Sequence, residues 1–244
     1  MNNRQNIVPE CGAHLPLLRN SEFVALPDGV AHLYCGGEAP VLRAAFDGLR
    51  EYATDKSAGA RGRRRMEERV EETRSLLGRR LDLPNAERCV GFAASVSHGL
   101  DLVARAFAGR PGDAVVLADE FPSLPLAFAN RSAHGSGLRF VSPGEGCDER
   151  LVAAITSGAR VVCVSHVNHR TGQRLDLGPV AAACRAAGVP LIVDASHSAG
   201  VIPVPAEHCD VIVSCTHKFL FGLHGVGFVH WNEDRLGPMP IATL

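Results

Sequence analysis

The sequence is poor in lysine. Of its 25 basic residues only Lys56 and Lys218 are lysines, so arginine supplies nearly all of the positive charge. Arginine cannot replace lysine in imine chemistry, because its guanidinium group stays protonated. Lys218 lies in an apolar, glycine-rich segment, HKFLFGLHGVG. In a chain with so few lysines, this position favours a chemical role for the Lys218 amine. The alternative is that Lys218 is simply a surface lysine beside a turn.

Several motifs of other protein classes are missing. No G-x-G-x-x-G follows a predicted strand, as a dinucleotide site would require, and no G-x-S-x-G elbow suggests a hydrolase. Tyr52 and Lys56 have the spacing of a short-chain dehydrogenase pair, but they precede the strand-rich region. No H-E-x-x-H or H-x-x-x-H spacing occurs, so we expect no metal site.

Composition excludes further classes. The eight cysteines include no C-x-x-C pair and several lie in apolar runs, which indicates reduced core residues of a cytoplasmic protein. The net charge of −1 gives no reason to expect nucleic acid or a membrane surface as a partner. No segment approaches the roughly 18 apolar residues of a membrane span, and the N-terminus has no signal-peptide core.

An alternation of strands and helices begins near residue 88. It predicts an α/β fold with a mainly parallel, seven-stranded sheet covered by helices on both faces. The predicted strands are Cys89–Ala93, Ala114–Ala118, Leu138–Val141, Val161–Val164, Pro190–Val193, Val211–Ser214 and Gly227–Trp231. The last connection is too short for a crossover helix, so the final strand is expected to be antiparallel. The predicted helices are 40–55, 62–80, Ser97–Phe107, Pro122–Asn130, Asp148–Thr156 and Leu177–Ala187.

The N-terminal third is organised differently. Residues 1–32 are expected to form an irregular arm, followed by a short strand at His32–Cys35, and residues 33–244 to form the main domain. The basic run at 61–65 precedes four glutamates, which indicates a solvated helix face with i,i+4 ion pairs.

An acid and a lysine follow two neighbouring buried strands. Asp194 ends the run at 191–193, and Lys218 follows the run at 211–213. Ligands of open α/β sheets bind at the carboxyl ends of strands, so both groups can face one ligand. Pyridoxal 5′-phosphate (PLP) needs such a pair: a lysine for its Schiff base and an acid that keeps its pyridine nitrogen protonated.

Other polar or aromatic residues follow the remaining strands. Ser95 and Ser97 stand at a helix start, where free N–H groups can seat a phosphate, although simple capping is the commoner role. Phe121 can lie on a pyridine ring or belong to the core. The strand at 161 ends in an unusually polar cluster, SHVNHRTG, which begins at Ser165.

These motifs resemble the class V aminotransferase family of fold-type I PLP enzymes, over roughly residues 30–235. HVNHRTG, DASHSAG, CTHK and DEFPS are most similar to kynureninase, and cysteine desulfurases share a similar frame. The resemblance implies the large domain of a fold-type I PLP transferase. It also implies a homodimer that acts on an α-amino acid.

The resemblance implies a role for each matching residue. Lys218 would form the Schiff base and move the substrate α-proton, Asp194 would pair with the pyridine nitrogen, and His197 would lie near the ring oxygen or that acid. The remaining implied cofactor contacts are Phe121 against the ring, Val96 and Ser97 at the phosphate, Ser165, His169 and His217.

Departures from the family patterns leave the reaction open. Kynureninases have tyrosine in place of His217, and desulfurases have asparagine in place of His169. Family members normally continue into a smaller C-terminal domain, so this sequence is expected to be either a fragment or a reduced protein without that domain. The alternatives are therefore a non-catalytic PLP-binding fragment or interaction module, and more remotely a nucleotide-binding α/β protein.

Overall fold

A computed structural model describes residues 19–129 and 137–239. Most of the arm predicted over 1–32, the end of the helix predicted at Pro122–Asn130, and residues 240–244 lie outside the described residues.

Seven strands form one sheet in the order β1-β7-β6-β5-β4-β2-β3. The strands are β1 (Val90–Ala93), β2 (Asp113–Leu117), β3 (Leu138–Val141), β4 (Ala159–Ser165), β5 (Leu191–Asp194), β6 (Val211–Cys215) and β7 (Gly227–Trp231). Strands β2 to β6 pair in parallel, and β7 is antiparallel to both of its neighbours, β6 and β1. The predicted α/β class, strand count and antiparallel final strand are confirmed.

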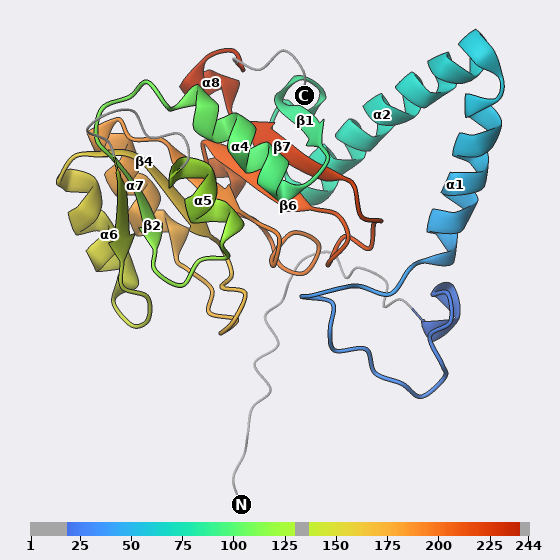
Figure 1. The fold of residues 1–244 in the computed structure, drawn as a ribbon, viewed down its shortest axis with the longest axis horizontal. Helices are drawn as coiled ribbons and strands as arrows, with labels where there is room; N and C mark the ends of the chain where they lie inside the picture. Colours follow the sequence, from blue (N-terminus) through green and yellow to red (C-terminus); the bar gives the residue numbers. More distant parts are fainter. Residues whose placement is uncertain (1–18, 130–136, 240–244) are drawn as a thin grey trace, which may run out of the picture.

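Helices cover both faces of this sheet (Figure 1). The longer ones are α1 (Arg43–Lys56), α2 (Gly59–Leu81), α4 (Val96–Ala106), α5 (Ser123–Ala129), α6 (Cys147–Thr156) and α7 (Leu177–Ala187), and the single-turn ones are α3 (Ala86–Cys89) and α8 (Glu233–Leu236). Helices α4 and α5 pack on one face, and α6 and α7 pack on the other.

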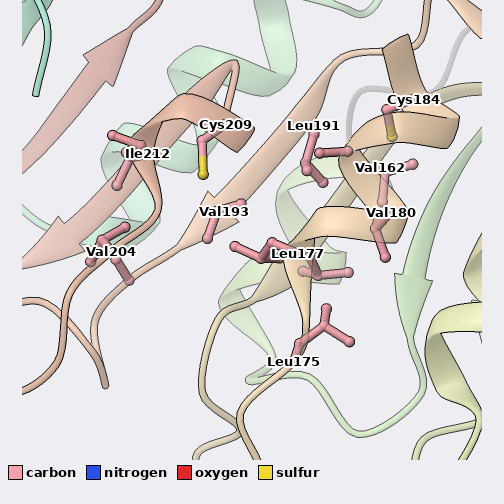
Figure 2. Packing of buried hydrophobic residues seen from close by; sticks show 14 of the residues in the cluster. Val162, Leu175, Leu177, Val180, Cys184, Leu191, Val193, Val204, Cys209 and Ile212 are labelled. Carbon is pink, nitrogen blue, oxygen red and sulfur yellow. The ribbon is translucent and has the colours of Figure 1, made fainter. Parts of the chain in front are cut away.

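Alternation along the central strands divides the core into two layers. Val162, Val164 and Val193 pack with α6 and α7, whereas Cys163 and Ile192 pack with α4 and α5. Figure 2 shows the first layer, in which Leu177 and Val180 of α7 lie over Leu191 and Val193 of β5. Burial on both faces explains why these strands are continuous β-branched runs rather than alternating ones.

The N-terminal helices form a hairpin that projects away from the sheet (Figure 1). The solvated face expected around the basic run is confirmed by the exposed i,i+4 pair of Arg63 and Glu67, 2.9 Å apart. No helix within the described residues is long and apolar enough to cross a bilayer.

Two sequence expectations about local structure are wrong. His32–Cys35 is not a strand, because the chain turns there: the carbonyl of Tyr34 accepts hydrogen bonds from the N–H groups of Gly37 and Glu38. A Cβ at Gly37 would lie 2.3 Å from the Tyr34 ring, so a larger residue there would displace this exposed side chain. Cys89 belongs to α3 rather than to β1, because its N–H donates to the carbonyl of Asn85 (2.8 Å).

Candidate active site

The predicted site residues follow five of the strands that end at one edge of the sheet. The carboxyl ends of β1, β2, β4, β5 and β6 point the same way, because β7 is antiparallel to both β1 and β6. Ser165 and Asp194 are register partners at the ends of β4 and β5. Their side chains therefore leave the sheet on the same face, the one covered by α4 and α5.

Lys218 stands on a tight loop between β6 and β7. The loop is anchored where the Thr216 hydroxyl donates to the carbonyl of Val226 (2.9 Å), and a Cβ at Gly222 would lie 2.6 Å from that of Thr216. The Lys218 amine lies 3.2 Å from Nε2 of His197 and 5.7 Å from the centroid of the Phe121 ring. A cation near an aromatic face is favourable, and the same ring offers a flat surface to a planar ligand.

His197 has two competing partners on one nitrogen. Its Nε2 lies 3.2 Å from the Lys218 amine and 3.1 Å from the carbonyl oxygen of Gly36. If Nε2 carries a proton it can donate to Gly36, and if it does not it can accept from a Lys218 ammonium. Burial lowers the pKa of His197, and the positive charge of Lys218 lowers it further, which favours the neutral ring.

Asp194 is a buried acid whose side chain is held by a backbone hydrogen bond. Its side chain is only 6% exposed, and Oδ1 accepts a hydrogen bond from the N–H of Ser196 (2.8 Å). This bond fixes the carboxylate at the end of β5. A buried carboxylate is stable only beside hydrogen-bond donors or a cation, so Asp194 is suited to a cationic ligand group.

Phe121 and His169 lie beside each other near Lys218 and His197. Their rings are edge to face with centroids 5.4 Å apart, and the His169 ring is 6.4 Å from that of His197. Phe121 is 46% exposed, so it is not the core residue that the alternative interpretation expects. Nδ1 of His169 is buried and has no hydrogen-bond partner among the described residues, and burial lowers the pKa of this ring.

The start of α4 provides backbone donors. Ser95 caps the helix by accepting from the N–H of His98 (3.1 Å), and the first intrahelical bond runs from Gly99 to Ser95. The amides of Val96 and Ser97 precede that bond, so the helix itself does not satisfy them. Gly227 of β7 lies directly behind this turn: a Cβ there would be 3.2 Å from the amide nitrogen of Val96.

His217 is turned towards a second cluster. Its ring stacks on that of His224 at 4.0 Å, and His224 Nε2 lies 2.6 Å from Glu38. The carbonyl of His217 accepts from the N–H of Ala39 (3.1 Å), so the chain around 36–39 crosses the Lys218 loop. His217 remains close enough to Lys218 for that charge to contribute to its lowered pKa, after burial and His224.

Sequence reasoning missed several residues at this edge. Glu120 is buried and binds Ser165 through both the N–H (2.8 Å) and the hydroxyl of that residue. Asn168 donates to Asp119 (2.8 Å), which joins the ends of β4 and β2. The available signal was the acidic pair after β2, but its partners depend on β2 lying beside β4, which the sequence does not reveal.

The donor set fits PLP better than it fits a metal. Among residues 19–129 and 137–239, no group of histidine, cysteine and acidic side chains is arranged to hold a metal ion. The amine of Lys218, the fixed carboxylate of Asp194 and the exposed ring of Phe121 match an aldehyde, a pyridinium nitrogen and an aromatic plane. The unsatisfied Nδ1 of His169 and the free amides at the start of α4 leave donors for the remaining oxygens.

Comparison with known proteins agrees with this chemistry. Residues 38–243 match the family model for aminotransferase class-V. A probable cysteine desulfurase of Methanothermobacter thermautotrophicus is 26% identical over 211 residues, which are 82% of this chain and 51% of the relative. The kynureninase of Pseudomonas fluorescens is 34% identical over 90 residues, which are 36% of this chain and 22% of the relative.

Solved structures show the same fold. The cysteine desulfurase CsdA of Escherichia coli superposes with a TM-score of 0.76 at 19% identity, over 88% of this chain and 57% of that one. A C-DES variant with glycine covalently linked to its PLP cofactor gives a TM-score of 0.73 at 21% identity, over 84% of this chain and 57% of that one. The chain spans about half the length of curated relatives that it matches over most of its own length. With most of its length matched, the chain belongs to the aminotransferase class-V family, whose cofactor is pyridoxal 5′-phosphate.

Proposed function

We propose that this chain binds PLP through Lys218 and acts on an α-amino acid. The observation that carries the proposal is the placement of the Lys218 amine 3.2 Å from His197 and 5.7 Å from the centroid of the Phe121 ring, at the edge where Asp194 ends β5. Residues 33–244 would then serve as the cofactor-binding domain. When bound, PLP draws electrons from an attached amino acid, so that its Cα–H bond becomes acidic.

Each site residue would bind a different part of PLP. Lys218 would hold the cofactor aldehyde, Asp194 the pyridine nitrogen, and Phe121 one face of the ring. Val96 and Ser97 would bind the phosphate through the first turn of α4, where the helix dipole favours anions. Ser165, His169 and His217 are the remaining proposed contacts, with His217 nearest the phosphate.

Proton transfer at the substrate would fall to Lys218 and His197. A neutral lysine amine can take the α-proton and return it, because it lies at the site where the cofactor is attached. His197 contacts the Lys218 amine through Nε2 and can exchange that contact for the carbonyl of Gly36. It would therefore orient the amine in whichever protonation state the step requires.

The subsequent reaction is left open among those of the relatives: transamination, cleavage of a side chain as in kynureninases, or removal of sulfur as in cysteine desulfurases. We also propose that the protein works as a homodimer. A cytoplasmic location is supported by the seven described cysteines, all of which are free thiols.

The test is exchange of the substrate α-proton. The chain is supplied with PLP and a panel of α-amino acids in deuterated water, and deuterium at Cα is measured by mass spectrometry. We expect exchange with at least one amino acid, reduced by about 10²- to 10⁴-fold in Lys218→Ala, since a positioned acid–base group contributes that much. Lys56→Ala, which removes the other lysine, is the matched control and should behave as the unmodified chain.

A second candidate is a PLP-binding protein without turnover. The observation that favours it is that the chain spans about half the length of curated relatives that it matches over most of its own length. This candidate predicts cofactor attached to Lys218 but no α-proton exchange with any amino acid, so the same panel separates the two.

A further inference from the structure

Glu120 is a buried acid that the proposed chemistry does not use. It follows β2, only 7% of its surface is exposed, and both of its oxygens bind Ser165. Oε1 accepts from the Ser165 N–H (2.8 Å), and Oε2 pairs with the Ser165 hydroxyl. A charge buried this deeply must be compensated or neutralised by a proton.

The surroundings of Glu120 favour its protonated, neutral form. Burial raises its pKa to about 7, and the charges of Asp194 on β5 and of Asp119 beside it add to this effect against the two hydrogen bonds from Ser165. The other titratable groups that face it are the thiol of Cys163 on β4 and that of Cys147 on α6, both of which burial keeps protonated. Glu120 can therefore change its protonation state near neutral pH.

Ser165 connects Glu120 to the candidate site. It is the register partner of Asp194, so both side chains leave the sheet on the face where the ligand is proposed to lie. A serine hydroxyl has one proton and two lone pairs. If Glu120 is ionised, that proton points to Oε2 and the hydroxyl can only accept from a ligand. If Glu120 is protonated, Glu120 donates to Ser165, whose own proton is then free to point to a ligand oxygen.

A small cavity beside Glu120 can hold a water molecule. Glu120 and Ser165 both line a cavity of about 20 Å³, and Asp119 and Asn168 also line it. This volume accommodates one water molecule, and the polar lining supplies its hydrogen-bond partners. A water in this cavity would accept or return the proton of Glu120 while the carboxyl group stays against Ser165.

We propose that Glu120 is a positioning residue whose protonation sets the direction of the Ser165 hydroxyl, and thereby whether Ser165 donates to or accepts from an oxygen of the bound cofactor. The inference rests on the proposed function, because it takes the cofactor to lie against Ser165. Its first half, the titration of Glu120 against Ser165, is a property of the chain without cofactor.

The first measurement is made on the cofactor-free chain. The infrared band of protonated carboxyl groups is followed between pH 5 and 9. We expect one component to disappear with a midpoint near 7 and to be missing from Glu120→Gln, since the pKa of Glu120 lies there. Glu145→Gln, which changes an exposed glutamate, is the control and should keep that component. A component that persists in Glu120→Gln would overturn the proposal.

The second measurement follows PLP binding by equilibrium dialysis at pH 6 and pH 8. Gln in place of Glu120 can still accept from the Ser165 N–H and donates permanently to its hydroxyl, which copies the protonated acid. We expect the ratio of the two dissociation constants to differ between the unmodified chain and Glu120→Gln by about fivefold, the factor of one ordinary hydrogen bond. Ser165→Ala should change this ratio in the same direction.

Different outcomes overturn the inference about Glu120 and the proposed function. If borohydride traps PLP on Lys218 but Glu120→Gln and Ser165→Ala keep the pH dependence of the unmodified chain, the inference about Glu120 is wrong and the proposed function stands. If PLP is not held by Lys218 at all, the proposed function fails and the cofactor half of this inference fails with it, while the infrared titration still decides the Glu120–Ser165 half.

Discussion

The side chains of Lys218 and Asp194 are held in place by different contacts. These contacts determine how a substitution at each residue affects cofactor binding and folding. Asp194 is held by the N–H of Ser196, whereas Lys218 depends on the loop between β6 and β7 and on His197. The acid can therefore be neutralised without disturbing its hydrogen bond to the backbone.

Asp194→Asn is expected to weaken PLP binding by about 10- to 100-fold, the range for loss of one charge-assisted hydrogen bond. The amide oxygen of Asn can still accept from Ser196, so the free energy of unfolding without cofactor should change by less than about 1 kcal/mol. Equilibrium dialysis and urea denaturation measure the two quantities. Asp47→Asn on the exposed face of α1 is the control, and equal PLP affinity in both variants would refute the role of Asp194.

Glu120 is expected to influence stability with pH. Its folded-state pKa of about 7 lies above the 4.5 of an exposed glutamate, so the native state holds the proton longer than the unfolded state does. The stabilisation is complete below about pH 4.5 and is lost as the pH rises through 7, by about 3 kcal/mol as an order of magnitude. His166, whose pKa burial lowers to about 4, has the opposite slope, and stability gained from it rises with pH.

Comparison with Glu120→Gln isolates this contribution. The free energy of unfolding of the cofactor-free chain is measured from pH 5 to 8 by urea denaturation. The difference between the unmodified chain and the variant should move in favour of the variant as the pH rises. A difference that does not vary with pH would contradict the raised pKa of Glu120.

Among individual residues, the sequence predicts which polar groups come after each strand but not which strand ends are neighbours. The contact of Lys218 with His197 joins groups that come after β5 and β6, which are consecutive in the chain and adjacent in the sheet. The burial of Glu120 against Ser165 depends on the pairing of β2 with β4. Non-local pairing of that kind is decided by the packing of the whole sheet, so no local pattern could have revealed it.

Among the helices and strands, the position of α4 over β7 determines where its first turn lies. Gly99 allows the close approach, because a Cβ there would be 2.9 Å from the Cγ2 atom of Val229. The neighbouring Gly227 provides the same closeness behind Val96. Glycine at both contacts allows the start of α4 to lie close against the sheet.

Gly99→Ala is expected to lower the free energy of unfolding by about 1 kcal/mol, since the crowding of a packed core outweighs the better helix propensity of alanine. It should also weaken PLP binding, because α4 must shift away from β7. Gly48→Ala in α1 is the matched control: its Cβ would meet nothing within 4 Å, so the same substitution should stabilise by about 0.5 to 1 kcal/mol. Stabilisation by Gly99→Ala would show that α4 is not seated by this contact.

Most elements could be predicted from hydrophobic periodicity, and the exceptions have local causes. The strand expected at His32–Cys35 is a turn, because Leu33 and Tyr34 have no buried face to pair against and Gly37 permits the reversal. The strand expected from Cys89 begins one residue later, because a helical hydrogen bond to Asn85 takes its N–H group.

Across the molecule as a whole, exposed apolar side chains concentrate in the N-terminal third. Leu33 is 93% exposed, and Phe46, Leu49 and Tyr52 of α1 are about half exposed. Phe46, Leu49 and Tyr52 recur every three residues along α1, so they lie near one another on the helix, and exposed apolar side chains grouped in this way indicate a surface that another chain or domain covers. The proposed homodimer is one way of covering it.

The double variant Phe46→Asp and Leu49→Asp is expected to weaken self-association at least tenfold, because two charges would have to be buried in the interface. Sedimentation velocity over a concentration series gives the measurement. Phe140→Asp, at an exposed position on the edge strand β3, is the control. A monomeric unmodified chain, or equal effects of both variants, would argue against a dimer formed through α1.

Every other proposed role depends on Lys218 holding the cofactor. Covalent trapping tests this attachment directly. The chain is mixed with PLP, its absorbance is recorded, borohydride is added, and the modified peptide is identified by mass spectrometry. Because the chain has only two lysines, the alternatives are Lys56 and the N-terminal amine. We expect a band that borohydride fixes onto Lys218, that Lys218→Ala lacks and that Lys56→Ala retains. Modification spread over Lys56 and the N-terminus, or a band unchanged in Lys218→Ala, would show that Lys218 does not hold PLP.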